Sequence, residues 1–220
     1  MKPGDAIFFH NINNLRYLDL KVSRAQKYAF LSVDIDGFMA KNIILDTDSD
    51  GLHFQSPIKN AIIENIKGRT EDDLLAFTLG DYIAYQVTNE GDFENISMVN
   101  IYPENAKAVL KIIGSGVDSL YKFKNFTLDN VYGSCYSAPI AIVDGAGLGA
   151  DLINTRVENL KISNINVITP YAHIVEYTAT GGGDVKFSNI RAIDKKLINF
   201  HSSAVLDTLT IDGVDKDSSL

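Results

Sequence analysis

One six-residue pattern recurs along almost the whole chain: apolar, any, apolar, any, a bend-forming residue, apolar. The fifth position holds Asn in six copies, Asp in one and Gly in one: Asp19, Asn42, Asn65, Asn100, Asn130, Asn164, Asn189 and Gly213. These residue types tolerate a left-handed backbone best. We therefore predict a sharp bend at the same place in every repeat.

The residues around each bend alternate between apolar and polar, which is the period of a β-strand with one buried face. The bend residues follow one another at intervals of 23, 23, 35, 30, 34, 25 and 24 residues, as expected for one coil of a solenoid each. A β-sandwich would need a hairpin turn about every 8 to 12 residues and gives no reason for a repeated Asn. The sequence predicts an all-β parallel β-helix of about eight rungs, almost free of helix, with loops inserted in the third, fourth and fifth intervals.

The composition fits a globular chain, with 45% apolar and 22% charged residues among 220. The 20 Lys and Arg against 28 Asp and Glu give a net charge of −8, which disfavours nucleic acid as a partner. Cys135 is the single cysteine, so an internal disulfide is excluded, and no Cys and His group has the spacing of a zinc site. No segment reaches the roughly 18 apolar residues of a membrane span, and no signal peptide is visible at the start.

The repeat covers nearly all of residues 1–220, so we expect a single β-helix domain. The end rungs of a solenoid leave strand edges open, and such edges must be covered to prevent aggregation. Neither end of the sequence shows an amphipathic helix or a polar cap. We therefore expect the chain to be a fragment of a longer protein or to be capped by partner chains in an oligomer.

Residues at equal distances after the bend should stack at the strand spacing of about 4.8 Å. Seven and eight residues after successive bends, this rule brings Asp50, Asp72, Asp73 and Lys107 together, with Lys27 on the coil before them. Three residues further on, Phe30, His53, Ala76, Lys111 and Ala141 should point to the same side. Between them, an apolar interior is predicted from Leu52, Phe54, Leu75, Phe77, Leu110, Ile112, Ile140 and Ile142.

The acid cluster, as we call Asp50, Asp72 and Asp73, has the composition of an acid–base site. Carboxyls this close cannot all ionise freely, so one should keep its proton to an unusually high pH, as a general acid must. If two of them lie about 6.5–9.5 Å apart, a water fits between them, as in an inverting glycosidase. Two other interpretations stay open. In the first, the aspartates are ordinary turn residues without a function in catalysis. In the second, they bind Ca²⁺, and Lys107 or Lys111 is the base of a lyase.

The sequence motifs around the acid cluster resemble those of family-28 glycoside hydrolases, the polygalacturonase group. Residues 48–51, Asp-Ser-Asp-Gly, and residues 71–73, Glu-Asp-Asp, correspond to that family's Asn-Thr-Asp-Gly and Gly-Asp-Asp motifs. The resemblance implies a right-handed parallel β-helix of the pectin-lyase type and hydrolysis with inversion. It also implies that Asp50 and Asp73 activate the attacking water, that Asp72 is the general acid and that no cofactor is needed.

The same comparison of motifs bears on the substrate. Where the family has Gly-His-Gly and Arg-Ile-Lys, this chain has no histidine near residues 107–109 and no basic residue near residues 138–141. We therefore expect a glycan other than pectate, with His53, Lys107 and Lys111 as substrate-binding residues. The altered site and the missing caps resemble phage tail spikes and appendage proteins. This resemblance implies a homotrimer on a virion tail, acting outside the cell on cell-surface polysaccharide or teichoic acid, without inserting into a membrane.

Two alternative functions remain. One is a non-catalytic receptor-binding or structural β-helix that keeps a degenerate acid cluster. The other is a bacterial polygalacturonase-like hydrolase or a metal-assisted lyase. Asn95-Ile-Ser and Asn125-Phe-Thr match glycosylation acceptors, but both lie inside predicted strands and are taken as chance matches.

Overall fold

The structure of the protein is a computed structural model, and it describes residues 6–79, 91–114, 121–146, 152–192 and 195–213. These residues form strands, bends and turns, and no helix occurs among them. Accordingly, the described part of the chain contains no helix long and apolar enough to cross a membrane. The all-β prediction is confirmed. The loops predicted in the third, fourth and fifth intervals fall mainly on residues 80–90, 115–120 and 147–151, which lie outside the described residues.

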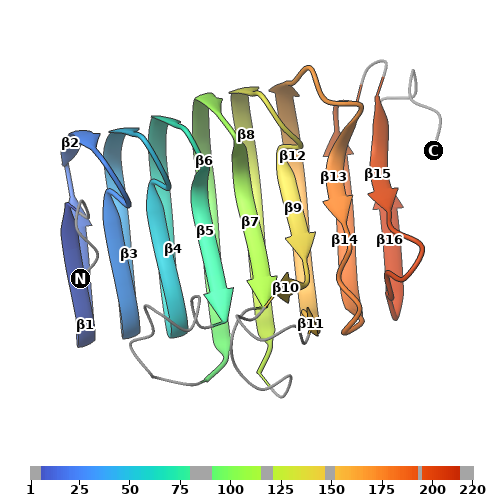
Figure 1. Ribbon diagram of the computed structural model, residues 1–220, viewed down its shortest axis with the longest axis horizontal. Helices are drawn as coiled ribbons and strands as arrows, with labels where there is room; N and C mark the ends of the chain where they lie inside the picture. Colours follow the sequence, from blue (N-terminus) through green and yellow to red (C-terminus); the bar gives the residue numbers. More distant parts are fainter. Residues whose placement is uncertain (1–5, 80–90, 115–120, 147–151, 193–194, 214–220) are drawn as a thin grey trace.

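Fourteen strands join one parallel sheet that curls around the core, as in a parallel β-helix (Figure 1). Two further short strands, β10 and β11, pair antiparallel. The strands are β1 (Ile7–Leu18), β2 (Lys21–Ala25), β3 (Phe30–Thr47), β4 (Leu52–Thr70), β5 (Asp73–Leu79), β6 (Phe93–Ala106), β7 (Ala108–Gly114), β8 (Phe123–Cys135), β9 (Ile140–Val143), β10 (Gly145–Ala146), β11 (Leu152–Ile153), β12 (Val157–Ile168), β13 (His173–Tyr177), β14 (Gly183–Ile190), β15 (Lys196–Phe200) and β16 (Thr208–Asp212).

The predicted repeats pair with one another in the predicted register. Leu15 lies opposite Phe38, Phe38 opposite Ala61, and Ala61 opposite Ile96. The later repeats continue in the same way through β8, β12, β14 and β16. Each repeat thus adds its strands beside those of the previous one, and Figure 1 shows the sequence colours running in order from one end of the stack to the other.

Each central coil contains three strand segments, which stack into three strips. Strip 1 contains residues 52–55, 75–78, 110–113 and 140–143. Strip 2 contains residues 61–64, 96–99, 126–129 and 160–163, and strip 3 contains residues 66–68, 101–103, 131–133 and 165–167. The predicted apolar interior is buried and comes from strip 1. Within this interior, the aromatic rings of Phe54 and Phe77 stack on each other, with 4.7 Å between their centroids.

The bend between strips 2 and 3 is formed by the predicted bend residues. All eight have a left-handed backbone, with φ between 51° and 62°. Their amides form a ladder along the stack, in which Asn65 Nδ2 donates to Asn42 Oδ1 at 2.9 Å and Asn100 Nδ2 donates to Asn65 Oδ1 at 2.9 Å. Asn is favoured here because it both tolerates this backbone and links neighbouring coils.

A second row of left-handed residues, missed by the sequence analysis, lies five positions before the first. It contains Asn14, Gly37, Asn60, Asn95, Asn125 and Asn159. Asn125 Nδ2 donates to Asn95 Oδ1 at 2.9 Å, and Asn95 Nδ2 donates to Asn60 Oδ1 at 3.0 Å. The two apparent glycosylation acceptors therefore belong to a second asparagine ladder.

The first coil departs from the predicted stacking. The sequence places Phe30 beside His53, and this is wrong: Phe30 lies opposite Leu52 in the core, and Leu31 lies opposite His53. Arg24, with φ of 62°, is an extra residue between Ser23 and Ala25, where β2 bulges against β3. A bulge shifts every later residue of its strand by one. The shift therefore brings Tyr28, rather than Lys27, level with Asp50.

Candidate functional site

The candidate site lies at the corner between strip 3 of one coil and strip 1 of the next, seen in Figure 1 as the turn between β4 and β5. Backbone hydrogen bonds connect the corner residues of successive coils. Asp72 N–H donates to Ser49 C=O at 3.4 Å, and Lys107 N–H donates to Asp72 C=O at 3.1 Å. Ser137 N–H then donates to Lys107 C=O at 3.2 Å. Stacking at the corner thus places Asp72 and Lys107 on neighbouring coils, as predicted.

Asp50 and His53 form a buried pair beside this corner. Asp50 Oδ2 lies 2.6 Å from His53 Nδ1, and Asp50 Oδ1 accepts the backbone N–H of Asp73 at 3.2 Å. The His53 ring stacks on Tyr28, with 4.0 Å between centroids, and its Nε2 lies 3.4 Å from Thr78 Oγ1. His53 is only 3% exposed. Its contacts are those of a residue that fixes Asp50, while its use in substrate binding stays a prediction.

Asp73 is the most perturbed carboxyl among the described residues. It is 3% exposed, and its Oδ2 lies 3.6 Å from Lys111 Nζ. Burial and then the charge of Asp50 raise the pKa of Asp73 to about 8, although Lys111 opposes the shift. A carboxyl with that pKa is largely protonated at neutral pH. The expectation that one aspartate keeps its proton is therefore met by Asp73.

Asp72 differs from its neighbour in exposure and in partner. Its side chain is 39% exposed and accepts a hydrogen bond from Lys107 Nζ at 2.8 Å. Burial lowers the pKa of Lys107, but the hydrogen bond and the charge of Asp72 outweigh burial and leave that pKa raised. The turn is held by Thr70 Oγ1, which donates to Asp72 C=O at 2.8 Å, and by the Tyr136 hydroxyl, which donates to the Glu71 carbonyl.

A cavity of about 110 Å³ opens between these groups. It is lined by Lys27, Tyr28, Asp50, His53, Asp72, Asp73, Ala76, Thr78, Lys111 and Ile113. Pockets that enclose a drug-sized ligand measure roughly 300–1,000 Å³. This one is smaller, so it can enclose only a small group or one part of a larger ligand.

The carboxyls of the acid cluster lie close together, with one oxygen from each within 4.8 Å of the others. The spacing of about 6.5–9.5 Å that leaves room for a water refers to whole carboxyl groups rather than to single oxygens, so the inverting outcome stays a prediction. One oxygen of each aspartate could also bind a hard cation such as Ca²⁺, so the metal-binding interpretation stays a prediction as well. Lys107 Nζ and Lys111 Nζ stand beside Asp72 and Asp73, where they already supply positive charge.

The structure brings five of the six predicted site residues to this cavity: Asp50, His53, Asp72, Asp73 and Lys111. Lys107 adjoins it through Asp72. Tyr28, Thr78 and Ile113 also line the cavity and were not among the residues expected there. Tyr28 reaches His53 only because of the bulge at Arg24, which left no sequence signal. Thr78 lies two residues after Ala76, which stacks on His53, so the alternation of side chains along a strand could have found it.

The roles of the three aspartates stay predictions, but their electrostatics favour Asp73 over Asp72 as the proton donor. Comparisons of the chain with protein-family models, with curated proteins and with solved structures find no match. The resemblance of the motifs to family-28 glycoside hydrolases and to phage tail spikes therefore also stays a prediction. Function has to be inferred from the chemistry of the residues themselves.

Proposed function

We propose that the protein is a glycan depolymerase that hydrolyses a cell-surface polysaccharide or a teichoic acid, with Asp73 as general acid and Asp72 as the base. One observation carries the proposal. A buried carboxyl with a pKa raised to about 8 shares a cavity with a half-exposed carboxyl, with oxygens of the two within 4.8 Å. Two carboxyls whose environments separate their proton affinities are what acid–base cleavage of a glycosidic bond requires.

In this mechanism Asp73 gives its proton to the oxygen of the scissile bond. The bond between that oxygen and the sugar carbon breaks, and the oxygen of a water forms a bond to the same carbon. Asp72 accepts the proton that this water loses, and exchange with solvent restores both groups. Because Asp73 must be protonated at the start, we expect the rate to fall as the pH rises above about 8.

The other predicted site residues have supporting roles. The charge of Asp50 helps to keep Asp73 protonated, and Asp50 holds the Asp73 backbone by a hydrogen bond at 3.2 Å. His53 fixes Asp50 from the other side at 2.6 Å. Lys107 and Lys111 place two ammonium groups beside the acid cluster, where they can bind anionic groups of the polymer. Neither a metal nor a cofactor has a part in this mechanism.

We further propose the finer architecture and setting that the sequence predicts. The fold is a right-handed parallel β-helix of about eight rungs, of the pectin-lyase type, within a homotrimeric tail spike or appendage of a phage that acts outside the cell. The regular parallel register and the three aspartates on consecutive coils support this proposal. Its partner is the polymer, rather than nucleic acid or the membrane interior.

The test is release of reducing ends and phosphate from purified Gram-positive wall polymers and polygalacturonate. We expect cleavage of one polymer, a loss of about 10²–10⁴-fold in Asp73→Asn and in Asp72→Asn, and no effect of chelator. Asp48→Asn is the matched control, because Asp48 lies on the corresponding turn of the preceding coil, has 58% of its side chain exposed and does not line the cavity.

Other outcomes would support the alternative functions. New ultraviolet absorbance from unsaturated ends, together with loss of activity in chelator, would identify a metal-assisted lyase. Binding to cells without release from any polymer would identify a receptor-binding β-helix with a relic acid cluster. Full activity in Asp73→Asn would refute its role as the general acid.

A further inference from the structure

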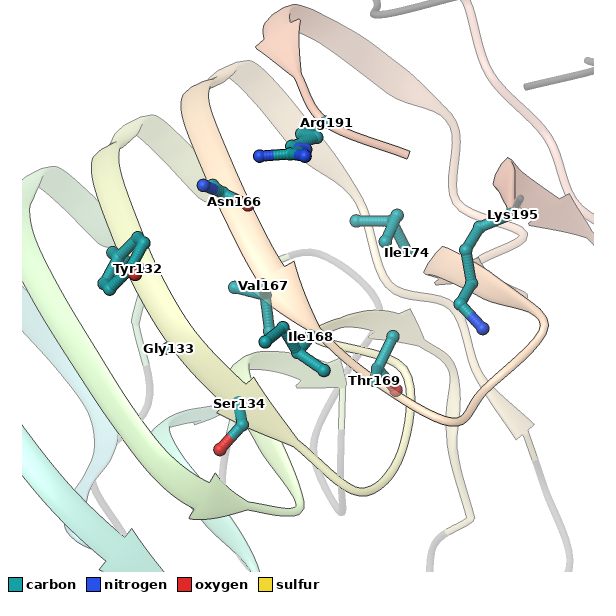
Figure 2. A pocket seen from close by; sticks show the side chains of 10 residues that line it. All are labelled: Tyr132, Gly133, Ser134, Asn166, Val167, Ile168, Thr169, Ile174, Arg191 and Lys195. Carbon is teal, nitrogen blue, oxygen red and sulfur yellow. The ribbon is translucent and has the colours of Figure 1, made fainter. Parts of the chain in front are cut away.

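A second hollow, of about 500 Å³, lies on the outer side of strip 3 near the C-terminal coils (Figure 2). Tyr132 on β8 lies opposite Asn166 on β12. Arg191 takes the same place on the next coil, because the preceding Ile190 lies opposite Ile165. Figure 2 shows Tyr132, Asn166 and Arg191 in one line, with Lys195 on the other side of the hollow. We call this hollow the C-terminal groove.

The C-terminal groove is positively charged in a protein whose net charge is −8. Within the described part of the chain, its lining contains Arg191 and Lys195 but no carboxylate. Among the described residues, neither cation has an ion pair, whereas Lys107 and Lys111 in the candidate site are paired with aspartates. Two cations without carboxylate partners favour an anionic ligand, and Arg binds carboxylates and phosphates through two parallel hydrogen bonds.

The other lining groups suit a sugar. Tyr132 is 64% exposed and Ile168 is 76% exposed, so a ring and an aliphatic side chain face solvent beside the Asn166 amide. Amphipathic rings of this kind provide contact area at low cost in conformational entropy. A neighbouring hollow of about 440 Å³ shares Tyr132, Asn166 and Arg191 and continues over the bend residues Asn130, Asn164 and Asn189. Together the two hollows suit an elongated ligand.

The C-terminal groove also lies along the same corner as the acid cluster. Ser137 N–H donates to Lys107 C=O, and Thr169 Oγ1, which lines the groove, donates to Ser137 C=O at 2.7 Å. Thr169 is thus three coils from Asp72, or about 14 Å at the strand spacing of about 4.8 Å. One extended polymer could contact both places.

We propose that the C-terminal groove binds an anionic segment of a glycan, with its phosphate or carboxylate groups on Arg191 and Lys195 and a sugar ring against Tyr132. This binding does not depend on hydrolysis. If the proposed function also holds, the groove retains the polymer while the acid cluster cuts it.

The test compares Arg191→Ala/Lys195→Ala with wild type by affinity electrophoresis in gels that contain polygalacturonate, poly(glycerol phosphate) teichoic acid or neutral dextran. Lys161→Ala/Lys186→Ala is the matched control. It removes the same charge from the same region of the stack, but Lys161 and Lys186 are exposed, lie opposite each other on β12 and β14, and lie outside the groove. We expect at least tenfold weaker binding in the groove variant, less than twofold change in the control, and no retardation by dextran.

The two anionic polymers distinguish carboxylate from phosphate as the recognised group, and added salt should weaken binding to either because the contacts are exposed. Equal retardation of wild type and groove variant would overturn the proposal. So would a change from oligomer to monomer in the groove variant with unchanged glycan affinity, because the groove would then be an interface between copies of the chain. Groove-dependent binding without cleavage of any polymer would refute the proposed hydrolysis and leave the proposed binding site intact.

Discussion

The buried Asp73 carboxyl predicts a pH dependence of stability that one substitution should abolish. Its pKa is raised to about 8 in the folded protein, whereas an aspartate in an unfolded chain titrates near about 3.9. Between these values the folded state keeps a proton that the unfolded state has released. The stabilising effect of this proton is complete below about pH 4 and is lost as the pH rises through about 8.

The magnitude follows from the size of the shift. Stability falls by about 1.4 kcal/mol per pH unit while only the unfolded state is ionised, which amounts to about 4 kcal/mol between pH 5 and pH 8. Asparagine has nearly the shape of a protonated carboxyl and does not titrate. In Asp73→Asn, Lys111 has an uncharged neighbour, as it has beside protonated Asp73, and its side chain is 27% exposed and keeps contact with water.

The assay is urea unfolding of wild type and Asp73→Asn at pH 5, 6, 7 and 8, followed by far-ultraviolet circular dichroism because the chain has no tryptophan. Groups that do not interact with Asp73 cancel in the difference. We expect the free energy of unfolding of Asp73→Asn, relative to wild type, to rise by about 4 kcal/mol from pH 5 to pH 8. The exposed Asp48→Asn should show no such rise. A difference that is flat across this range would refute the burial argument.

Two further predictions concern the ladder and the single thiol. Asn65 has φ of 57° and hydrogen bonds to Asn42 and Asn100. Both Asn65→Ala and Asn65→Gly remove these hydrogen bonds, but glycine tolerates the left-handed backbone and alanine does not. Asn65→Ala should therefore lower stability by about 1–2 kcal/mol more than Asn65→Gly. Thermal melts of the two variants check this, and an equal or reversed order would contradict it. Burial and the charge of Asp73 raise the pKa of the Cys135 thiol to about 12, so it should react with Ellman's reagent far more slowly in native protein than in urea. Equally fast reaction in both states would contradict the burial of this thiol.

The repeat predicted the fold well because a solenoid turns sequence spacing into spatial contact. The intervals of 23, 23, 35, 30, 34, 25 and 24 residues are the register offsets of the paired strands. Changes of interval length did not disturb the register, because the added residues lie between the paired segments. The second left-handed row recurs in six repeats, always five positions before the first, so the same spacing rule applied at that position would have predicted it.

The site could be predicted to the level of which residues meet, but not to the level of their charge states. Equal offsets brought Asp50, Asp72 and Asp73 together, yet the stacking rule treats Asp72 and Asp73 alike. In the structure, Asp73 begins β5 and is buried, whereas Asp72 lies in the turn and is half exposed. Burial and the charge of Asp50 raise the pKa of Asp73, and both depend on atomic positions that spacing does not contain.

The C-terminal groove shows a further limit of the stacking rule. Tyr132, Asn166 and Arg191 occupy one position of the repeat, but they share neither size, charge nor polarity, so nothing in the sequence marks them as a set. Their common property is their place on the outer side of strip 3, where the described lining residues of the groove include no carboxylate. Repetition identifies the residues that build a solenoid, since these must recur in every coil. Residues that bind a ligand on its surface break the repeat, and they become visible only when the coils are assembled.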